Sequence, residues 1–213
     1  MSTRIPRSHP RYQSLSIRNK LAEAMKKGLV HETGLIAHGR GEAFDYLIGE
    51  QTLPIADEAE KIAAAALLLA DQPVISVNGN VVALVARDCV QLAKMISAAI
   101  EVNLFHRTQE RINKLIAELQ LVDDYPVLGI NATARIPGLD HDRGWCEKKG
   151  IFSSDVVLVP LEDGDRCQAL KAMGKTVITI DLNPLSRTAK TADITLVDNV
   201  VRAVPRMMYW VEQ

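Results

Sequence analysis

The stretch 181–188, DLNPLSRT, combines side chains suited to holding a nucleotide. Asp181 follows an apolar, β-branched run, where an acid can accept hydrogen bonds from ribose hydroxyls. Arg187 offers a planar fork for phosphate oxygens, Thr188 adds a hydroxyl, and Pro184 stiffens the turn. The alternative is a capping turn, in which the acid, the amide and the serine bond only to backbone groups. Spacing alone leaves both interpretations open.

Polar side chains also end the other apolar, β-branched runs of the chain. If these runs are strands of a parallel sheet, their ends meet along one edge, where open α/β sheets bind ligands. We therefore expect a binding edge built from residues that are far apart in the sequence. They are Asn78, Gly79 and Asn80, then His106, Arg107 and Thr108, then Asn131, Asp181, Asn183, Asp198 and Asn199.

Strands and helices alternate from residue 71 onward, and these elements would position the polar ends. This alternation predicts an α/β fold with a mostly parallel sheet flanked by helices. Strands are predicted at 73–78, 99–104, 126–131, 155–160, 175–181 and 192–198, and helices at 79–98, 108–120, 165–173 and 199–211.

The first 70 residues are predicted to be helical. Apolar residues recur at helical spacing over 16–29, and the segment 31–50 predicts one or two short helices broken around Gly39 and Gly41. The segment 55–70 predicts a strong helix, which its run IAAAALLLA suggests is buried. We expect a single domain over residues 1–213, with a helical segment 1–70 preceding an α/β core 71–213.

Composition and charge are typical of a soluble, cytoplasmic protein. The 213-residue chain has a net charge of −1, which provides no general basic field for nucleic acid or an anionic membrane. Its three cysteines lack the short spacings of zinc or redox sites, so a reducing cytoplasm is expected. The longest apolar run is too short to span a bilayer, and the first ten residues lack a secretory core.

Arginine and lysine are locally enriched in the first forty residues, which suits a phosphate-bearing small molecule as well as RNA. His9, His31 and His38 share no metal-binding spacing, and no Asp/Glu cluster marks a metal site formed by protein alone. The stretch His141–Trp145 places His, Asp and Arg in a glycine-flanked loop. Whether it is a lid or substrate loop, or an ordinary salt-bridged turn, stays open.

A relaxed phosphate-loop pattern occurs at 169–176, ALKAMGKT. A working phosphate loop follows a strand and opens a helix, whereas this one closes a predicted helix and opens a strand. We therefore interpret Gly174 as a helix C-cap and Lys175 as a solvated cation.

The stretch 77–82, VNGNVV, has the order strand, turn, helix. Gly79 permits a close backbone approach, and the helix N-terminus after it could hold an anion. An ordinary Asn-Gly turn explains it equally well.

Six blocks of the sequence together resemble the archaeal phosphopantothenate synthetases, also called 4-phosphopantoate–β-alanine ligases. The resemblance covers nearly the whole chain and implies a homodimer with a Rossmann-like core. It also implies ligation of 4-phosphopantoate to β-alanine with ATP, releasing AMP and diphosphate, in coenzyme A biosynthesis. The blocks are IPRSHPRYQSL, RGEAFDYLIGE, ISVNGN, EVNLF, VPLEDGDR and IDLNPLSRTA.

The resemblance also implies which residues hold ATP. They come from the first helix, the HGRGEAF block, the DLN and RT of the long motif, and the DNV that follows. By position they are Arg18, Arg40, Asp181, Leu182, Asn183, Arg187, Thr188, Asn199 and Val200. The family's NLF block continues with tyrosine, whereas here it continues with His106.

AMP and diphosphate as products imply an acyl-adenylate, with Mg²⁺ bridging the triphosphate. The protein then mainly positions and neutralises three anions, which explains a demand for arginines. No catalytic base is assigned. For the substrates, the candidates are His9, Asn78, Asn80 and Arg107.

Two other functional classes compete with this ligase. An NAD-dependent transferase or sugar-phosphate isomerase could share such a sheet, but no lysine stands out as an imine former. A nucleotide-sensing or RNA-binding module could use the basic N-terminus, but aromatic residues make up only 4% of the chain and form no stacking stripe.

Overall fold

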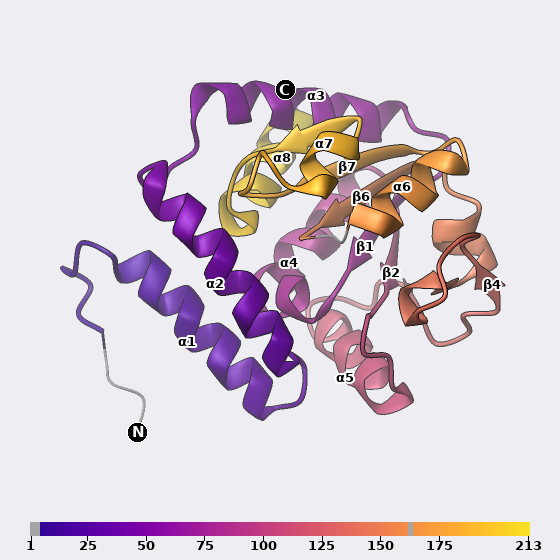
Figure 1. The fold of residues 1–213 in the computed structure, drawn as a ribbon, viewed down its shortest axis with the longest axis horizontal. Helices are drawn as coiled ribbons and strands as arrows, with labels where there is room; N and C mark the ends of the chain where they lie inside the picture. Colours follow the sequence, from indigo (N-terminus) through magenta and orange to yellow (C-terminus); the bar gives the residue numbers. More distant parts are fainter. Residues whose placement is uncertain (1–4, 162–163) are drawn as a thin grey trace.

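Six parallel strands form the central sheet of the computed structural model, which describes residues 5–161 and 164–213 (Figure 1). Their order is β3-β2-β1-β6-β7-β8, and every neighbouring pair is parallel. The α/β fold class predicted from the sequence is confirmed. The strands are β1 (Pro73–Val77), β2 (Ala99–Val102), β3 (Val127–Leu128), β6 (Val156–Pro160), β7 (Thr176–Ile180) and β8 (Ile194–Leu196).

The strand order reverses between β1 and β6, as in doubly wound dinucleotide-binding sheets. Val74 lies beside Val157 and Ile75 beside Leu158 at this junction. A crevice is expected outside the carboxyl ends of the strands at such a switch point.

Helices cover both faces of the sheet. Ile75 and Leu158 belong to the larger core cluster, which also contains residues of α4, α5 and α8, whereas Val74 and Val157 pack with α6 on the opposite face. This division follows from the alternation of side chains along a strand. The helices of this part are α4 (Gly79–Met95), α5 (Gln109–Gln120), α6 (Gly164–Ala172), α7 (Arg187–Thr191) and α8 (Val200–Glu212).

Three helices precede the sheet: α1 (Tyr12–Lys26), α2 (Glu32–Leu47) and α3 (Pro54–Leu69). Figure 1 shows α1 and α2 side by side at the lower left, and α3 running across the top of the view beside α8. The predicted break in the second helix is wrong, because α2 continues through both Gly39 and Gly41. Each helical glycine costs only about 1 kcal/mol, which packing can offset.

The third helix is only half buried, so its interpretation as a buried helix needs correction. Ala63 and Leu67 face α8 and the core, whereas the opposite face leaves Ile55, Ile62 and Leu69 exposed by 74%, 56% and 85%. An apolar run at helical spacing does not reveal whether both faces are covered.

The segment between β3 and β6 is a packed excursion. It holds a two-stranded sheet, β4 (Ala134–Arg135) with β5 (Trp145–Cys146), a 3₁₀ turn η1 (Asp142–Gly144) and the π-type turn η2 (Lys148–Phe152). Glu101 of β2 anchors it, accepting the backbone N–H groups of Glu147 at 2.8 Å and Ile151 at 2.7 Å. Burial raises the pKa of Glu101 to about 7. A Cβ at Gly150 would lie 2.1 Å from this carboxylate, so only glycine fits there.

The order around the phosphate-loop-like pattern is helix then strand, as predicted. Gly174, at φ +80°, follows α6 and precedes β7. The prediction that Lys175 is solvated is wrong. Its Nζ is buried and donates to the carbonyl oxygens of Phe152 at 2.9 Å and Ser154 at 2.6 Å. Burial lowers the pKa of Lys175.

Candidate nucleotide and substrate pocket

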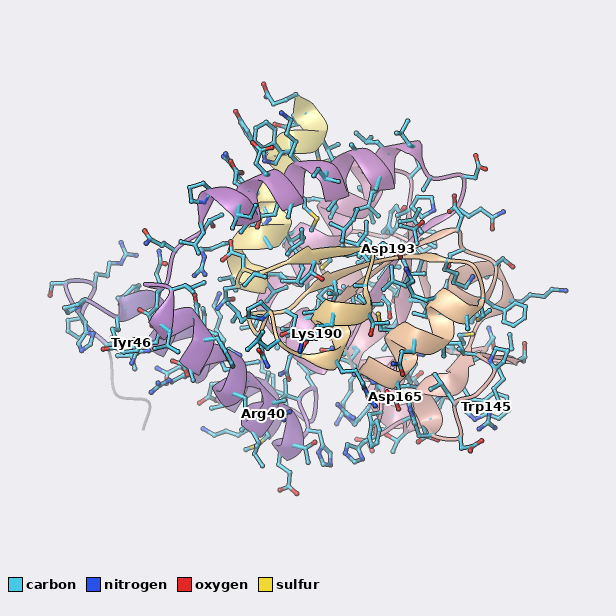
Figure 2. All side chains as sticks on the ribbon, turned by 45° about the horizontal axis from the view of Figure 1, so that its top comes forward. Arg40, Tyr46, Trp145, Asp165, Lys190 and Asp193 are labelled. Atoms are coloured by element: carbon cyan, nitrogen blue, oxygen red, sulfur yellow. The ribbon has the colours of Figure 1, made fainter. Side chains whose placement is uncertain are left out.

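A pocket of about 780 Å³ lies outside the carboxyl ends of the strands and is walled on one side by α2. We call it the strand-end pocket. Figure 2 shows Arg40 of α2 and Asp165 of α6 toward the same side of the molecule, away from Asp193. The carboxylate of Asp193 accepts the backbone N–H of Val177, near the amino end of β7. The pocket thus occupies the place expected from the switch point.

The strand-end pocket brings together most of the polar ends predicted from the sequence. The lining includes Arg40, Asn78, Asn80, Asp181, Leu182, Asn183, Thr188, Asn199 and Val200.

Four of the candidate site residues are not among its described lining residues. Arg18 and Arg187 are partly exposed beside it, with side chains 49% and 62% accessible. His9 lies in the exposed segment before α1, where its Nδ1 accepts the backbone N–H of Arg11. Arg107 turns away and donates to the carbonyl oxygen of Gly129 at 2.5 Å.

The DLNPLSRT turn is a capping turn that also lines the pocket. Asp181 accepts the backbone N–H of Asn183 at 2.9 Å and the hydroxyl of Ser186. Ser186 in turn caps α7 by accepting the N–H of Ala189 at 2.9 Å. The two interpretations of this stretch are therefore compatible, because the bonds that fix the turn also present Asp181 and Thr188 to the pocket.

The two asparagines after β1 are largely committed to holding the fold. Asn78 caps α4 by accepting the N–H of Val81 at 3.1 Å. Asn80 donates to the carbonyl oxygen of Gly34 at 2.9 Å, and a Cβ at Gly34 would lie 2.7 Å from its Oδ1. This contact fixes the start of α2 against the start of α4.

A buried polar network joins α2 to the end of β8. Asn199 caps α8, and its Nδ2 donates to Asp45 at 2.8 Å. Arg202 bridges Asp45 and Asp198, with Nη2 distances of 2.6 and 2.5 Å. Sequence reasoning missed Asp45 and Arg202; only the i,i+4 spacing of Asp198 and Arg202 could have indicated part of this network.

Cationic and imidazole side chains line the part of the strand-end pocket that adjoins Asn78 and Leu104, the residues after β1 and β2. Arg111 of α5 and Arg143 of η1 line it, together with His31 and His106, whose rings stack at 3.9 Å between centroids. We call this the β1–β2 half. Sequence reasoning missed Arg111, since nothing local sets it apart from a surface arginine, whereas Arg143 belongs to the His141–Trp145 loop, which the sequence leaves open as a substrate loop.

The His141–Trp145 loop forms part of the pocket's surroundings. His141 Nε2 lies 3.0 Å from a carboxylate oxygen of Asp165, and its ring packs 5.1 Å from Phe105. Asp165 also lies 4.0 Å from Arg187. The loop is thus packed against the pocket mouth and contributes Arg143 to the lining.

Within residues 5–161 and 164–213, no group of three or more His, Cys, Asp or Glu side chains is arranged to hold a metal ion. The thiols of Cys89, Cys146 and Cys167 are buried and form no disulfide with one another. None of the described helices combines the length and apolarity needed to cross a membrane.

Comparison with known proteins identifies the family of the chain. The family model described as phosphopantothenate/pantothenate synthetase matches residues 55–213. A relative from Thermococcus kodakarensis, named 4-phosphopantoate–β-alanine ligase, is 60% identical over 205 residues, covering 96% of this chain and 78% of the relative. One of the same name from Methanosarcina mazei is 56% identical over 211 residues, covering 99% and 83%. The chain belongs to the phosphopantothenate/pantothenate synthetase family.

Proposed function

We propose that this protein joins 4-phosphopantoate to β-alanine with ATP, forming 4′-phosphopantothenate, AMP and diphosphate for coenzyme A biosynthesis in the cytoplasm. Relatives that carry the ligase name are 56–60% identical over nearly the whole chain, and this observation carries the proposal. A strand-end pocket at the switch point of a doubly wound sheet is a site where nucleotides bind in such folds.

ATP occupies the half of the pocket formed by the ends of β7 and β8 in this proposal. Asp181 receives the ribose hydroxyls, while Asn199 and Val200 border the base and Arg40 faces the phosphates. Arg187 and Arg18 are exposed enough to turn toward bound phosphates, although each now contacts a carboxylate. Mg²⁺ would be held by the triphosphate oxygens and water.

The reaction proceeds in two displacements. A carboxylate oxygen of 4-phosphopantoate attacks the α-phosphorus of ATP, and the bond to the β-phosphate breaks to release diphosphate. The amine of β-alanine then attacks the acyl carbon, loses a proton, and displaces AMP. The chain's contribution is to align these reactants and to offset their negative charge.

Product analysis tests the proposal directly. The purified protein, incubated with both substrates, ATP and Mg²⁺, should yield AMP, diphosphate and phosphopantothenate in equal amounts. Omitting β-alanine serves as the control for the second displacement, since no phosphopantothenate can then form. Formation of ADP and orthophosphate would rule out the adenylate route.

A homodimer is proposed as well. The exposed residues Ile55, Ile62 and Leu69 give α3 an apolar face that lacks a partner within residues 5–161 and 164–213. Exposed apolar patches of this kind mark interaction surfaces in soluble proteins.

A further inference from the structure

We propose that Glu60 of α3 is a positioning residue for ATP: as a protonated carboxylic acid it donates a hydrogen bond to Asp198 and thereby fixes the wall of the strand-end pocket. Asp198 directly precedes Asn199 and Val200, which line that pocket. The inference rests on the proposed function, since it takes the strand-end pocket to be the ATP site. Glu60 itself lies behind the wall and is not among the described residues that line the pocket.

Glu60 is a buried carboxyl group to which the described residues offer no hydrogen-bond donor. Its side chain is fully buried, and its helix packs against α8 and β8 (Figure 1). Within residues 5–161 and 164–213, neither of its oxygens accepts a hydrogen bond, and the carboxyl group faces the carboxylate of Asp198. An ionised carboxylate in this setting would be costly, whereas a carboxylic acid has one O–H group to donate. The geometry therefore makes Glu60 the donor and Asp198 the acceptor.

The charges of the neighbouring network lead to the same assignment. Asp45 and Asp198 share the cation of Arg202, whose Nη2 lies 2.6 Å from the first and 2.5 Å from the second. Two carboxylates and one guanidinium leave a net charge of −1, which an ionised Glu60 would raise to −2. Carboxylates that share a buried site favour protonation of one of them. The proton belongs on Glu60, because the other two carboxylates accept hydrogen bonds from Arg202.

Burial is the largest cause of a raised pKa of Glu60, followed by the charge of Asp198, and the pKa rises to about 8. Two further charged groups act on Glu60, and they pair with each other. Asp57 lies one turn earlier on α3 and accepts a hydrogen bond from Arg206 of α8 at 2.9 Å. Asp57 favours the neutral form of Glu60 and Arg206 the ionised form, so their effects oppose each other. The carboxyl group is thus mostly protonated at neutral pH.

Asp198 connects this proton to the pocket wall. Its carboxylate accepts the hydroxyl of Thr52 at 2.6 Å and the backbone N–H of Asn199 at 2.7 Å. Asn199 caps α8, whose first residue, Val200, lines the pocket. With the proton in place, the two carboxyl groups attract each other and hold this turn. Without it, Glu60 and Asp198 repel each other, and the turn that carries Asn199 and Val200 is displaced.

ATP binding should therefore weaken with rising pH as Glu60 loses its proton. Only the protonated form keeps the pocket wall in place, so the apparent Kd depends on the fraction of protein that carries the proton. Isothermal titration calorimetry of the full-length wild type with ATP and Mg²⁺ tests this dependence. Binding at pH 9 should be roughly three- to tenfold weaker than at pH 7, because Glu60 titrates near pH 8.

Two substitutions separate the proton from the shape of the side chain. Glu60→Gln keeps a donor of the same size that cannot ionise, so its Kd for ATP should stay within about twofold of the wild-type value at pH 7, at both pH 7 and pH 9. Glu60→Leu has no donor, so its Kd should be at least about threefold weaker at pH 7 and equally weak at pH 9. Glu58→Gln, the same change at an exposed position of α3, is the matched control and should show the wild-type dependence.

A merely structural role of Glu60 predicts a different pattern. It would lower the melting temperature of Glu60→Leu without giving ATP binding a pH dependence that Glu60→Gln abolishes. If circular dichroism shows that Glu60→Leu does not fold, the comparison of Glu60→Gln with the wild type decides alone. A pH dependence of Glu60→Gln equal to that of the wild type would overturn the inference.

The same measurements distinguish a failure of this inference from a failure of the proposed function. Wild-type protein that binds ATP but forms no phosphopantothenate would refute the ligase, and the pH dependence of ATP binding would still decide the role of Glu60. Protein that forms phosphopantothenate but binds ATP with the same Kd at pH 7 and pH 9 would keep the ligase and overturn the inference. Protein that binds no ATP at either pH would overturn both.

Discussion

The Nδ2 of Asn199 donates to the carboxylate of Asp45 across 154 residues of sequence, which joins the N-terminus of α8 to the helix that walls the strand-end pocket. Arg202 strengthens this connection by bridging Asp45 and Asp198. The position of α2, and with it that of Arg40, therefore depends on a polar network behind the pocket.

Replacing Asp45 should weaken both stability and nucleotide binding. Asp45→Ala leaves Arg202 with one carboxylate instead of two in a buried setting, so the free energy of unfolding should fall by about 3 kcal/mol or more. The KM for ATP should rise, because α2 loses its attachment to the start of α8. Urea denaturation and initial-rate kinetics measure the two effects. Glu23→Ala, which breaks the exposed pair with Lys26, is the control and should leave the denaturation midpoint nearly unchanged.

A second consequence of the same network is a dependence of stability on pH. Glu60 of α3 is fully buried, and burial together with the neighbouring Asp198 raises its pKa from 4.5 to about 8. Since the folded pKa exceeds the unfolded one, the folded state binds the extra proton between these values. Stability should therefore be greatest on the acid side and fall as the pH rises from about 4.5 to about 8, by up to about 1.4 kcal/mol per pH unit.

Glu60→Gln should flatten this dependence, because the amide cannot ionise. Urea denaturation at pH 6 and pH 9 should show the variant losing less stability than the wild type between the two values. Glu101 also has a raised pKa, of about 7, so a smaller slope should remain. Identical slopes for the variant and the wild type would mean that Glu60 is already ionised near neutral pH.

Local pattern was enough to predict the sheet and the residues at its edge. The runs ending at Asn78, Asp181 and Asn199 are short, apolar and β-branched, and parallel strands place their ends on one side. Those predictions needed only periodicity and the rule for open α/β sheets. No detail of packing entered them.

The remaining features depend on contacts that no window of sequence contains. Arg111 resembles any surface arginine of an amphipathic helix, and only the approach of Leu29, 82 residues earlier, shows that it is held at the pocket. Lys175 follows a helix and precedes a strand, where a lysine is usually solvated. The carbonyl oxygens of Phe152 and Ser154 replace water there, and they come from η2 and the residues just after it.

Lys175 supplies a prediction that separates stability from function. Lys175→Ala should leave the KM for ATP within about threefold of the wild type, below the ~1.4 kcal/mol of a tenfold change. It should lower the melting temperature, because two buried carbonyl oxygens lose their donor. Kinetics and thermal denaturation of the same preparation measure both. A hundredfold rise in the KM would mean that the phosphate-loop-like stretch binds nucleotide after all.

The exposed face of α3 predicts a dimer that a single charge can disrupt. Light scattering at micromolar concentration should give about twice the 23.4 kDa mass of the chain. Ile62→Glu, in the middle of the face, should shift the mass toward the monomer because it buries an unpaired charge. Leu121→Glu, at the exposed C-cap residue of α5, is the control and should stay dimeric. A monomeric wild type would contradict the prediction.

If Asp181 binds ribose and Arg187 binds phosphate, replacing them should weaken the binding of different ligands. Asp181→Ala should weaken the binding of ATP and adenosine but not that of diphosphate, which has no ribose. Arg187→Ala should weaken the binding of ATP and diphosphate and leave the binding of adenosine almost unchanged. Each charge-assisted contact contributes about 1.5–3 kcal/mol, so the affected ligands should lose roughly ten- to a hundredfold in affinity. Calorimetric titration with the three ligands gives the pattern.

Folding has to be checked before the pattern is interpreted, because Asp181 holds Asn183 and Ser186 in the turn and Ser186 caps α7. Losing such a cap costs around 1 kcal/mol, which thermal denaturation would reveal. Leu185→Ala, an exposed position in the same turn, is the matched control and should bind all three ligands like the wild type. If folded Asp181→Ala and Arg187→Ala do the same, the turn only shapes the pocket wall. The nucleotide would then have to bind beside Asn78, Gly79 and Asn80, where α4 presents the positive end of its dipole.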